Sequence, residues 1–180
     1  MIECSTSNTY LIRVMKILLA KKIETDFIIP QQEGESKIGG INEFSRIGGI
    51  FNSRGRMIRS MRLAYRGSDG QFLPESFLKS CRSLRNCVAL VKCENNKIIG
   101  GYSPIPLITD GSSQEAVEDK NKSSFIFNLS SIKSYSLRET NALEYSKEQI
   151  GPHFGPDLRI DQDVTSSLGE FYQLPEGVKA

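Results

Sequence analysis

Hydrophobic and polar residues occur in blocks along the chain, and the clearest block lies between residues 87 and 103. Residues 88–93 are largely apolar on both faces that a strand presents, so this strand should be covered on both sides. A polar break at residues 94–97 contains two asparagines, which tolerate the left-handed backbone of a tight turn. After the break, Gly100 and Gly101 leave space for a neighbouring backbone or ring. This pattern predicts a β-hairpin at the centre of the core.

The N-terminal part of the chain predicts a helix, a short strand and a loop. Residues 9–22 have the spacing of an amphipathic helix that packs on the domain. Its apolar face would comprise Leu11, Val14, Met15 and Leu18. Residues 27–29, which a proline follows, predict a short strand. Residues 31–55 contain the pattern Ile-Gly-Gly-Ile twice and predict a flexible, glycine-rich loop.

The rest of the chain predicts one further helix and several strands. Residues 74–84 suit a helix because Pro74 is favourable in a first turn and apolar residues recur on one face. That inward face would comprise Phe77, Leu78, Cys81 and Leu84. A polar, acidic loop is expected at residues 109–123. Short apolar runs predict later strands at residues 125–129, 142–145, 158–160 and 168–172.

Short strands after a helical start predict an α+β fold, namely a two-sheet antiparallel β-sandwich with peripheral helices. Its buried core is expected to include Val88, Leu90, Ile98, Phe125 and Phe127. A length of 180 residues suits one packed unit. We divide it into a segment with the N-terminal helix and glycine-rich loop, residues 1–55, and a main domain, residues 56–180.

Five stretches, in their order along the chain, resemble signature motifs of the TLDc domain family. They are residues 63–70 (LAYRGSDG), 99–104 (IGGYSP), 124–129 (SFIFNL), 151–160 (GPHFGPDLRI) and 168–172 (LGEFY). The resemblance implies fold-determining roles for Gly100, Gly101, Tyr102, Gly151, Phe154, Gly155, Leu168 and Gly169. The chain departs from the family pattern where the glycine-rich FGGGHDL is shortened to FGPDL. Residues 1–55 lie outside these motifs.

The resemblance to the TLDc family implies a β-sandwich and a link to resistance to oxidative stress. It also implies a protein partner, because several family members bind the peripheral V₁ sector of the vacuolar proton pump, the V-ATPase. The family has no agreed catalytic mechanism, so the resemblance supplies no catalytic residue. We therefore expect a non-catalytic interaction domain that needs no cofactor.

Composition narrows the chemistry that the chain can support. It has a net charge of +2, four cysteines and a single histidine. The cysteines lack C-x-x-C spacing, and one histidine cannot complete a Cys/His zinc set, so no metal site is expected. Reduced thiols suit a cytoplasmic protein, with the nucleus as a second location. No apolar run approaches the roughly 20 residues that cross a bilayer, so we expect no transmembrane segment.

Three groups of reactive side chains merit separate interpretation. Cys87 is the best candidate for a redox thiol because basic residues are near it in sequence, although a buried, inert cysteine is the commoner case. His153 lies in a Gly/Pro-rich turn and is expected to be structural. Asp157, Asp161 and Asp163 lack calcium-loop spacing and would form an exposed acidic row if they lie on one strand.

Six arginines and no acidic residue occur between residues 45 and 68. Five of them form the candidate interaction site: Arg54, Arg56, Arg59, Arg62 and Arg66. If residues 56–65 are helical, three of these share one face. Arginine suits bidentate binding of carboxylate or phosphate.

These arginines lead to two hypotheses. The first is an interaction domain with an acidic protein partner, and the second is a nucleic-acid-binding regulator of the stress response, whose binding would weaken steeply with salt. The second ranks lower because the segment lacks aromatic residues for stacking and any known DNA-binding motif. An enzyme that handles peroxide through a cysteine ranks last, because no resolving cysteine or activating histidine is evident.

Overall fold

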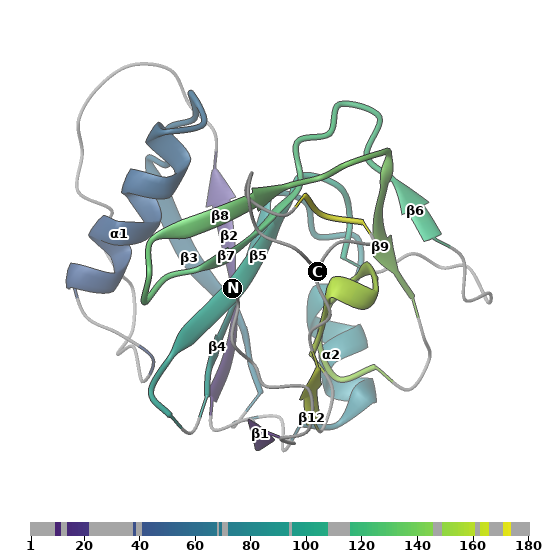
Figure 1. The fold of residues 1–180 in the computed structure, drawn as a ribbon. Coiled ribbons are helices and arrows are strands. Elements are labelled where there is room, and N and C mark those ends of the chain that lie inside the picture. The colour runs from purple at the N-terminus through teal and green to yellow at the C-terminus, as the bar shows by residue number, and fades with distance from the viewer. Residues whose placement is uncertain are drawn as a thin grey trace.

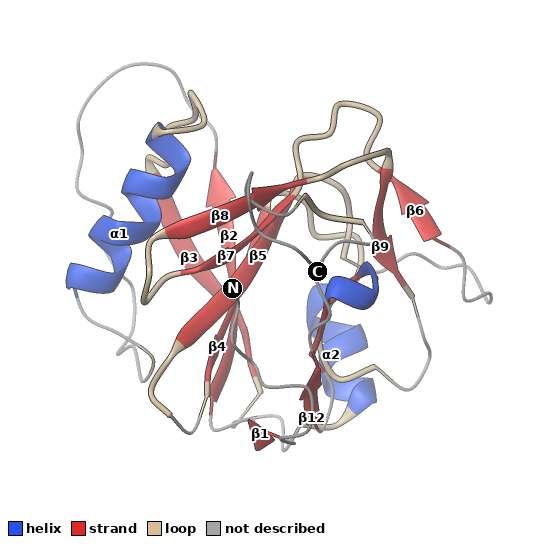
Figure 2. Ribbon diagram, viewed as in Figure 1, coloured by secondary structure: helices blue, strands red, loops and turns tan. Residues whose placement is uncertain are grey.

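The computed structural model describes residues 10–11, 14–21, 38, 41–67, 69, 72–93, 95–107, 116–145, 149–160, 163–165 and 171–173. Within them, two antiparallel sheets of six strands each pack together, with helices at the periphery (Figures 1 and 2). The predicted α+β two-sheet sandwich is confirmed.

The first sheet has the order β1 (Tyr10–Leu11), β12 (Asp163–Thr165), β11 (Leu158–Ile160), β10 (His153–Phe154), β9 (Asn141–Glu144) and β6 (Ala116–Glu118). The second has the order β3 (Ser60–Arg66), β2 (Val14–Lys21), β4 (Cys87–Lys92), β5 (Ile98–Ser103), β7 (Phe125–Asn128) and β8 (Lys133–Ser136). The helices are α1 (Ile41–Asn52), α2 (Pro74–Cys81) and the short 3₁₀ helix η1 (Gly155–Asp157).

The predicted hairpin is formed by β4 and β5, which pair from Cys87 opposite Ser103 to Lys92 opposite Ile98. Asn96 adopts the left-handed backbone, with φ of 62°, in the turn that joins them. Every residue of β5 is buried, as is every residue of β4 except the half-buried Lys92. The prediction of a hairpin covered on both faces is confirmed.

Successive residues of β4 point into two different cores. Ala89 and Val91 belong to the inter-sheet core, the buried cluster that includes Leu143 and Phe154 of the first sheet. Val88 and Leu90 belong to the helix-side core, the buried cluster between the second sheet and α1. Figure 1 shows α1 on the left of the second sheet, and α2 packs on the other face of that sheet, where its Phe77 contacts Tyr65 of β3 in the inter-sheet core. All five predicted core residues are buried, and all five lie in the helix-side core.

Helix α1 corrects the prediction of a loop at residues 31–55. Ile47, Ile50 and Phe51 recur at helical spacing and are buried against the second sheet. Gly48 and Gly49 stand between them, and an adjacent glycine pair is typical of a loop rather than a helix. Burial of the three apolar side chains outweighs that weak preference.

Strand β2 corrects the prediction of a helix at residues 9–22. It pairs with β3 on one side and with β4 on the other, so it is an interior strand of the second sheet. An interior strand of a sheet that is covered on both faces is apolar nearly throughout. The same composition resembles a helix with a wide apolar face. The short strand predicted at residues 27–29 lies outside the described residues.

The later elements agree with the predictions in most places. The predicted helix at 74–84 forms as α2 and buries Phe77 and Cys81. The predicted strands at 125–129, 142–145 and 158–160 form as β7, β9 and β11. The end of the predicted acidic loop instead contains β6, which pairs with β9. Of the run at 168–172, the structure describes Phe171 and Tyr172, and Tyr172 forms an isolated bridge with Leu137. The boundary between residues 55 and 56 stays a prediction.

Candidate interaction surface

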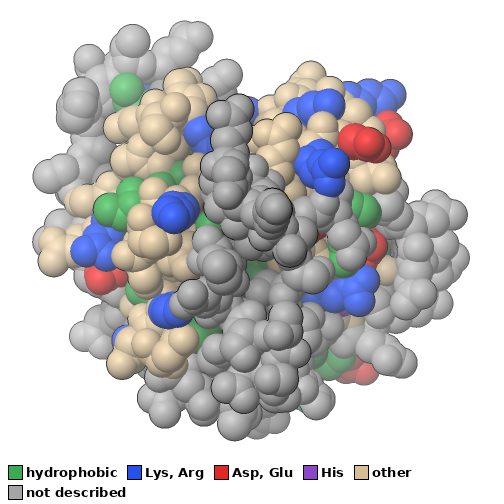
Figure 3. Space-filling view, viewed as in Figure 1, with side chains coloured by type: hydrophobic (Ala, Val, Ile, Leu, Met, Phe, Trp, Pro, Cys, Tyr) green, Lys and Arg blue, Asp and Glu red, His purple; other side chains and the backbone are tan. Residues whose placement is uncertain are grey.

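The arginine-rich segment is distributed over different elements. Arg46 lies on α1, Arg54 and Arg56 lie in the turn after it, and Arg62 lies on β3. Because residues 60–66 form a strand that pairs with β2, the helical face of arginines does not occur. In Figure 3, the described Lys and Arg side chains are spread over the visible face and do not gather in one patch.

Three of the candidate arginines have separate surroundings. Arg66 forms an ion pair with Asp69, with 3.0 Å between Nη1 and Oδ2. Arg62 is exposed on β3. Arg59 is half-buried, and its buried Nε has no hydrogen-bond partner within the described part of the chain. Arg59, Arg62 and Arg66 therefore differ from one another in exposure and in hydrogen bonding.

Arg54 and Arg56 flank the glycine that ends α1. Gly55 has a φ of 65°, in the left-handed region that favours glycine. This conformation lets the Arg56 N–H donate to the Phe51 carbonyl and the Gly55 N–H donate to the Asn52 carbonyl, at 3.0 and 2.9 Å. The two bonds form a Schellman motif, which satisfies carbonyl groups at a helix end. The C-terminal end of a helix also favours cations, so both arginines are well placed there.

Both arginines lie over a platform of three aromatic rings. Phe51 of α1 makes edge contacts with Tyr102 of β5 and Phe125 of β7, at centroid distances of 4.9 and 5.1 Å. The Tyr102 and Phe125 rings are 5.3 Å apart. All three side chains are buried in the helix-side core. The platform therefore joins α1 to two neighbouring strands at the turn.

The platform and nearby hydroxyl groups hold the two guanidinium groups in place. The Arg54 guanidinium lies 4.4 Å from the Phe125 ring centroid and donates to Ser134 Oγ and Ser136 Oγ of β8, both at 3.1 Å. The Arg56 guanidinium lies 5.3 Å from the Tyr102 centroid and donates to Tyr102 Oη at 3.2 Å. A cation over an aromatic face is attracted by the ring quadrupole.

The network continues to Asn86, the residue before β4. The Tyr102 hydroxyl, which accepts from Arg56, donates to Asn86 Oδ1 at 3.1 Å. Burial raises the pKa of Tyr102, and the nearby Arg56 charge opposes that increase. Tyr102 therefore remains a neutral hydroxyl that orients Arg56.

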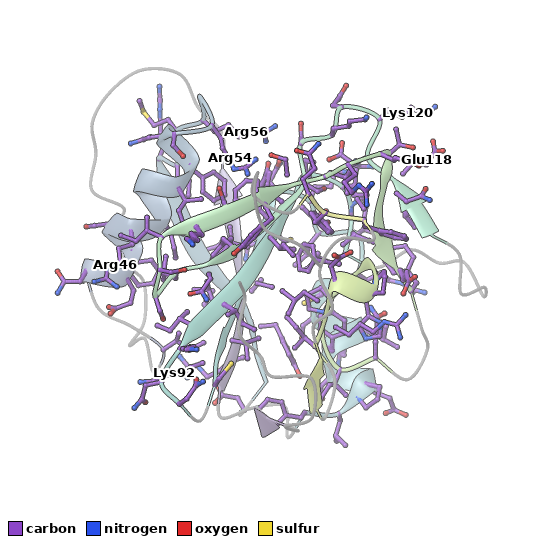
Figure 4. The ribbon with its side chains drawn as sticks, in the orientation of Figure 1. Arg46, Arg54, Arg56, Lys92, Glu118 and Lys120 are labelled. Atoms are coloured by element: carbon purple, nitrogen blue, oxygen red, sulfur yellow. The ribbon has the colours of Figure 1, made fainter. Side chains whose placement is uncertain are left out.

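No carboxylate neutralises this pair of arginines within the described part of the chain. Their hydrogen-bond acceptors are hydroxyl groups, and neither forms an ion pair there. Burial, and then the charge of Arg56, lower the pKa of Arg54. Figure 4 shows the two side chains close together at the end of α1, with Arg46 well away from them. The site is a fixed pair of like charges.

Cys87 does not meet the conditions for a redox thiol. It is 0% exposed, and burial raises its pKa to about 12, although the nearby Arg62 charge acts in the opposite direction. Cys81 and Cys93 are also buried. A reactive thiol needs access and a lowered pKa. The structure therefore supports the interpretation of Cys87 as an inert core residue.

The glycines of the family motifs allow close contacts. A Cβ on Gly100 would lie 2.1 Å from the Ala89 carbonyl oxygen, and one on Gly101 would lie 2.5 Å from the Phe154 ring. Gly155 has a φ of 57°, and a Cβ there would lie 2.2 Å from the Phe171 ring. Gly151 is also buried. Leu168 and Gly169 lie outside the described residues.

His153 and the aspartates serve structural roles where they are described. His153 is buried on β10, opposite Glu144 and Arg159, rather than in a turn. The prediction that Asp157 is exposed was wrong: it is fully buried and accepts a hydrogen bond from the Phe171 N–H at 2.6 Å. Asp161 lies outside the described residues. Within the described residues, no group of three His, Cys, Asp or Glu side chains is placed to hold a metal ion.

Sequence reasoning missed two structural features, a buried carboxylate and the turn that ends α1. Asp119, assigned to an acidic loop, is buried and accepts from the backbone N–H groups of Ser123 and Ser124 at 2.7 and 2.6 Å. The turn after α1 was also missed. A helical run of apolar residues that ends a few positions before a glycine is a helix-stop signal, and Gly55 provides it.

A family model describes most of the chain. The TLDc domain model matches residues 32–174. The chain belongs to the TLDc domain family. The family match starts at residue 32, before α1. Helix α1 therefore lies inside the family domain, although the sequence motifs did not include it. TLDc proteins are commonly linked to resistance to oxidative stress, and the domain suggests interaction with proteins.

No curated protein and no solved structure matches the chain. Among the described residues, no helix has the length and apolar character needed to cross a membrane.

Proposed function

We propose that this TLDc domain is a non-catalytic module that binds an acidic protein partner in resistance to oxidative stress. The peripheral V₁ sector of the vacuolar proton pump is the first candidate partner, because several family members bind it. The proposed location is the cytoplasm, with the nucleus as the alternative.

The observation that supports a protein partner is the pair formed by Arg54 and Arg56. Both groups are held by aromatic rings and hydroxyl groups, and neither is neutralised by a carboxylate of the described chain. Arginine is enriched at the centre of protein interfaces and often dominates the binding energy there.

The test measures binding of the full chain to purified V₁ sector. Arg54→Glu with Arg56→Glu should weaken binding at least about tenfold, because a close charge pair at an interface contributes more than 1.4 kcal/mol. The matched control is Lys79→Glu with Lys92→Glu, which makes the same change of charge. Lys79 is exposed on α2, and Lys92 lies at the far end of β4 from the arginine pair (Figure 4). Equal losses in both variants would contradict a specific surface.

The nucleic-acid alternative is tested with the same variants. Duplex DNA should bind weakly at physiological salt and without sequence preference. A sequence-selective complex whose affinity falls log-linearly with salt, and which Arg54→Glu with Arg56→Glu abolishes, would replace the protein-binding proposal.

A further inference from the structure

The turn after α1 brings two cations together over a set of aromatic rings. The rings of Phe51, Tyr102 and Phe125 contact one another directly. Two guanidinium groups close to each other repel, and partial burial increases the cost of each charge. A bound anion would convert this repulsion into attraction.

The remaining hydrogen-bond donors point to the kind of anion. A guanidinium has five N–H donors in a planar fork. Among the described residues, Arg54 uses two of them on the serines of β8, and Arg56 uses one on Tyr102. Each group therefore has at least two donors that no described residue accepts, which is the number that bidentate binding of a carboxylate or phosphate requires.

The surroundings favour an acidic protein segment over a nucleic acid. The Tyr102 and Phe125 rings are buried beneath the arginines, at 5% and 0% exposure, so they cannot stack on bases. Met57, beside Arg56 in sequence, exposes 38% of its surface. Methionine and arginine are both enriched at the centre of protein interfaces.

We propose that Arg54 and Arg56 together bind one carboxylate side chain of an acidic protein partner, with Met57 as the adjacent apolar contact. This inference rests on the proposed function, because it takes the partner to be a protein. It restricts recognition to the turn at residues 54–57 and gives Arg46, Arg59, Arg62 and Arg66 no direct part in carboxylate binding. The Schellman turn at Gly55 and the aromatic platform fix the spacing of the two arginines before the partner arrives.

The test separates fork geometry from charge. Arg54→Lys with Arg56→Lys keeps both charges but removes the planar forks, and Arg46→Lys with Arg62→Lys is the matched control on exposed arginines. Binding of the full chain is measured to V₁ sector and to a fluorescent hexaglutamate peptide. We expect at least about a tenfold loss for the first variant and less than about a twofold loss for the control.

Thermal unfolding of each variant shows whether it folds. If the double variant does not fold, Arg56→Lys alone carries the test, because among the described residues the Arg56 side chain makes one hydrogen bond, to Tyr102. We expect about a fivefold loss of peptide affinity for it. An unchanged affinity, or an equal loss in the Arg46/Arg62 control, would overturn the inference and leave the V₁ proposal intact.

Two further outcomes separate the inference from the proposed function. Peptide binding that requires the two forks, without any binding to V₁, would support the inference and reject the pump as the partner. Preferential binding of inorganic phosphate or duplex DNA, lost in the Arg54/Arg56 variant, would overturn the carboxylate assignment.

Discussion

Two glycine pairs, each preceded by isoleucine, have opposite physical roles in this protein. Gly100 and Gly101 lie in β5, at the centre of the second sheet, where an added Cβ would overlap a carbonyl oxygen or an aromatic ring. Gly48 and Gly49 lie in α1, where an added Cβ would meet no atom of the described residues within 4 Å. The fold requires the first pair and only tolerates the second.

The comparison shows that local sequence does not determine what a glycine contributes. In β5 the absent side chains leave space for the ring of Phe127, from the neighbouring strand, at Gly100 and for the ring of Phe154, from the first sheet, at Gly101. In α1 the same absence costs helix stability, about 1 kcal/mol per residue relative to alanine. The helix forms because its apolar face is buried against the second sheet. The contribution of that burial to the free energy of unfolding can be measured directly.

The largest expected effect comes from Leu90→Ala, which tests the contact between α1 and the second sheet. Leu90 pairs with Gly100 and is 2% exposed in the helix-side core. Its truncation should lower the free energy of unfolding by about 2–5 kcal/mol, since it leaves a cavity under α1. Chemical denaturation measures this loss. A neutral Leu90→Ala would show that α1 does not cover this face.

The next effect is expected for Gly100→Ala. The new Cβ would meet the backbone of Ala89, which belongs to an interior strand and cannot move independently. We expect a loss of about 3 kcal/mol, at the upper end of the usual cost of overpacking. The same denaturation experiment measures it. A loss below about 1 kcal/mol would mean that β4 and β5 separate more easily than their pairing indicates.

The third effect is expected for Gly101→Ala, at about 2 kcal/mol, because the clash is with a side chain rather than a backbone. Phe154→Leu should relieve part of it by removing the ring. In a double-mutant cycle, the two substitutions together should therefore cost less than the sum of the single losses. Additive losses would show that the ring of Phe154 is not what requires the glycine.

The elements predicted from the sequence are those whose pattern follows directly from burial. The β4–β5 hairpin was predicted because burial on both faces leaves an apolar run with a short polar turn. Strand β2 was mistaken for a helix because an interior strand and a broad helical face have similar composition. Helix α1 was mistaken for a loop because the preference of Gly48 and Gly49 is local, whereas the burial of Phe51 depends on distant strands.

The candidate site was predicted in composition but not in geometry. The sequence identified the arginine-rich segment and placed Arg54 and Arg56 in it. Their selection from the six arginines depends on the backbone of Gly55 and on rings that come from β5 and β7. Contacts between residues so distant in sequence leave no periodic pattern. The structure was therefore needed to separate this pair from Arg46 and Arg62.

The smallest effect, and the only stabilising one, is expected for Gly49→Ala on the exposed side of α1. Alanine fits here without a close contact to the described residues, and it restricts the conformations of the unfolded chain. The free energy of unfolding should therefore rise by about 0.5–1 kcal/mol. The control is Gly55→Ala in the turn of the same helix, which also has open space but a φ of 65°. That conformation should cost alanine about 1 kcal/mol, so the two substitutions should change stability in opposite directions. Thermal unfolding of both variants measures the signs. Destabilisation by Gly49→Ala would indicate that another part of the molecule or a partner approaches this face of α1 closely.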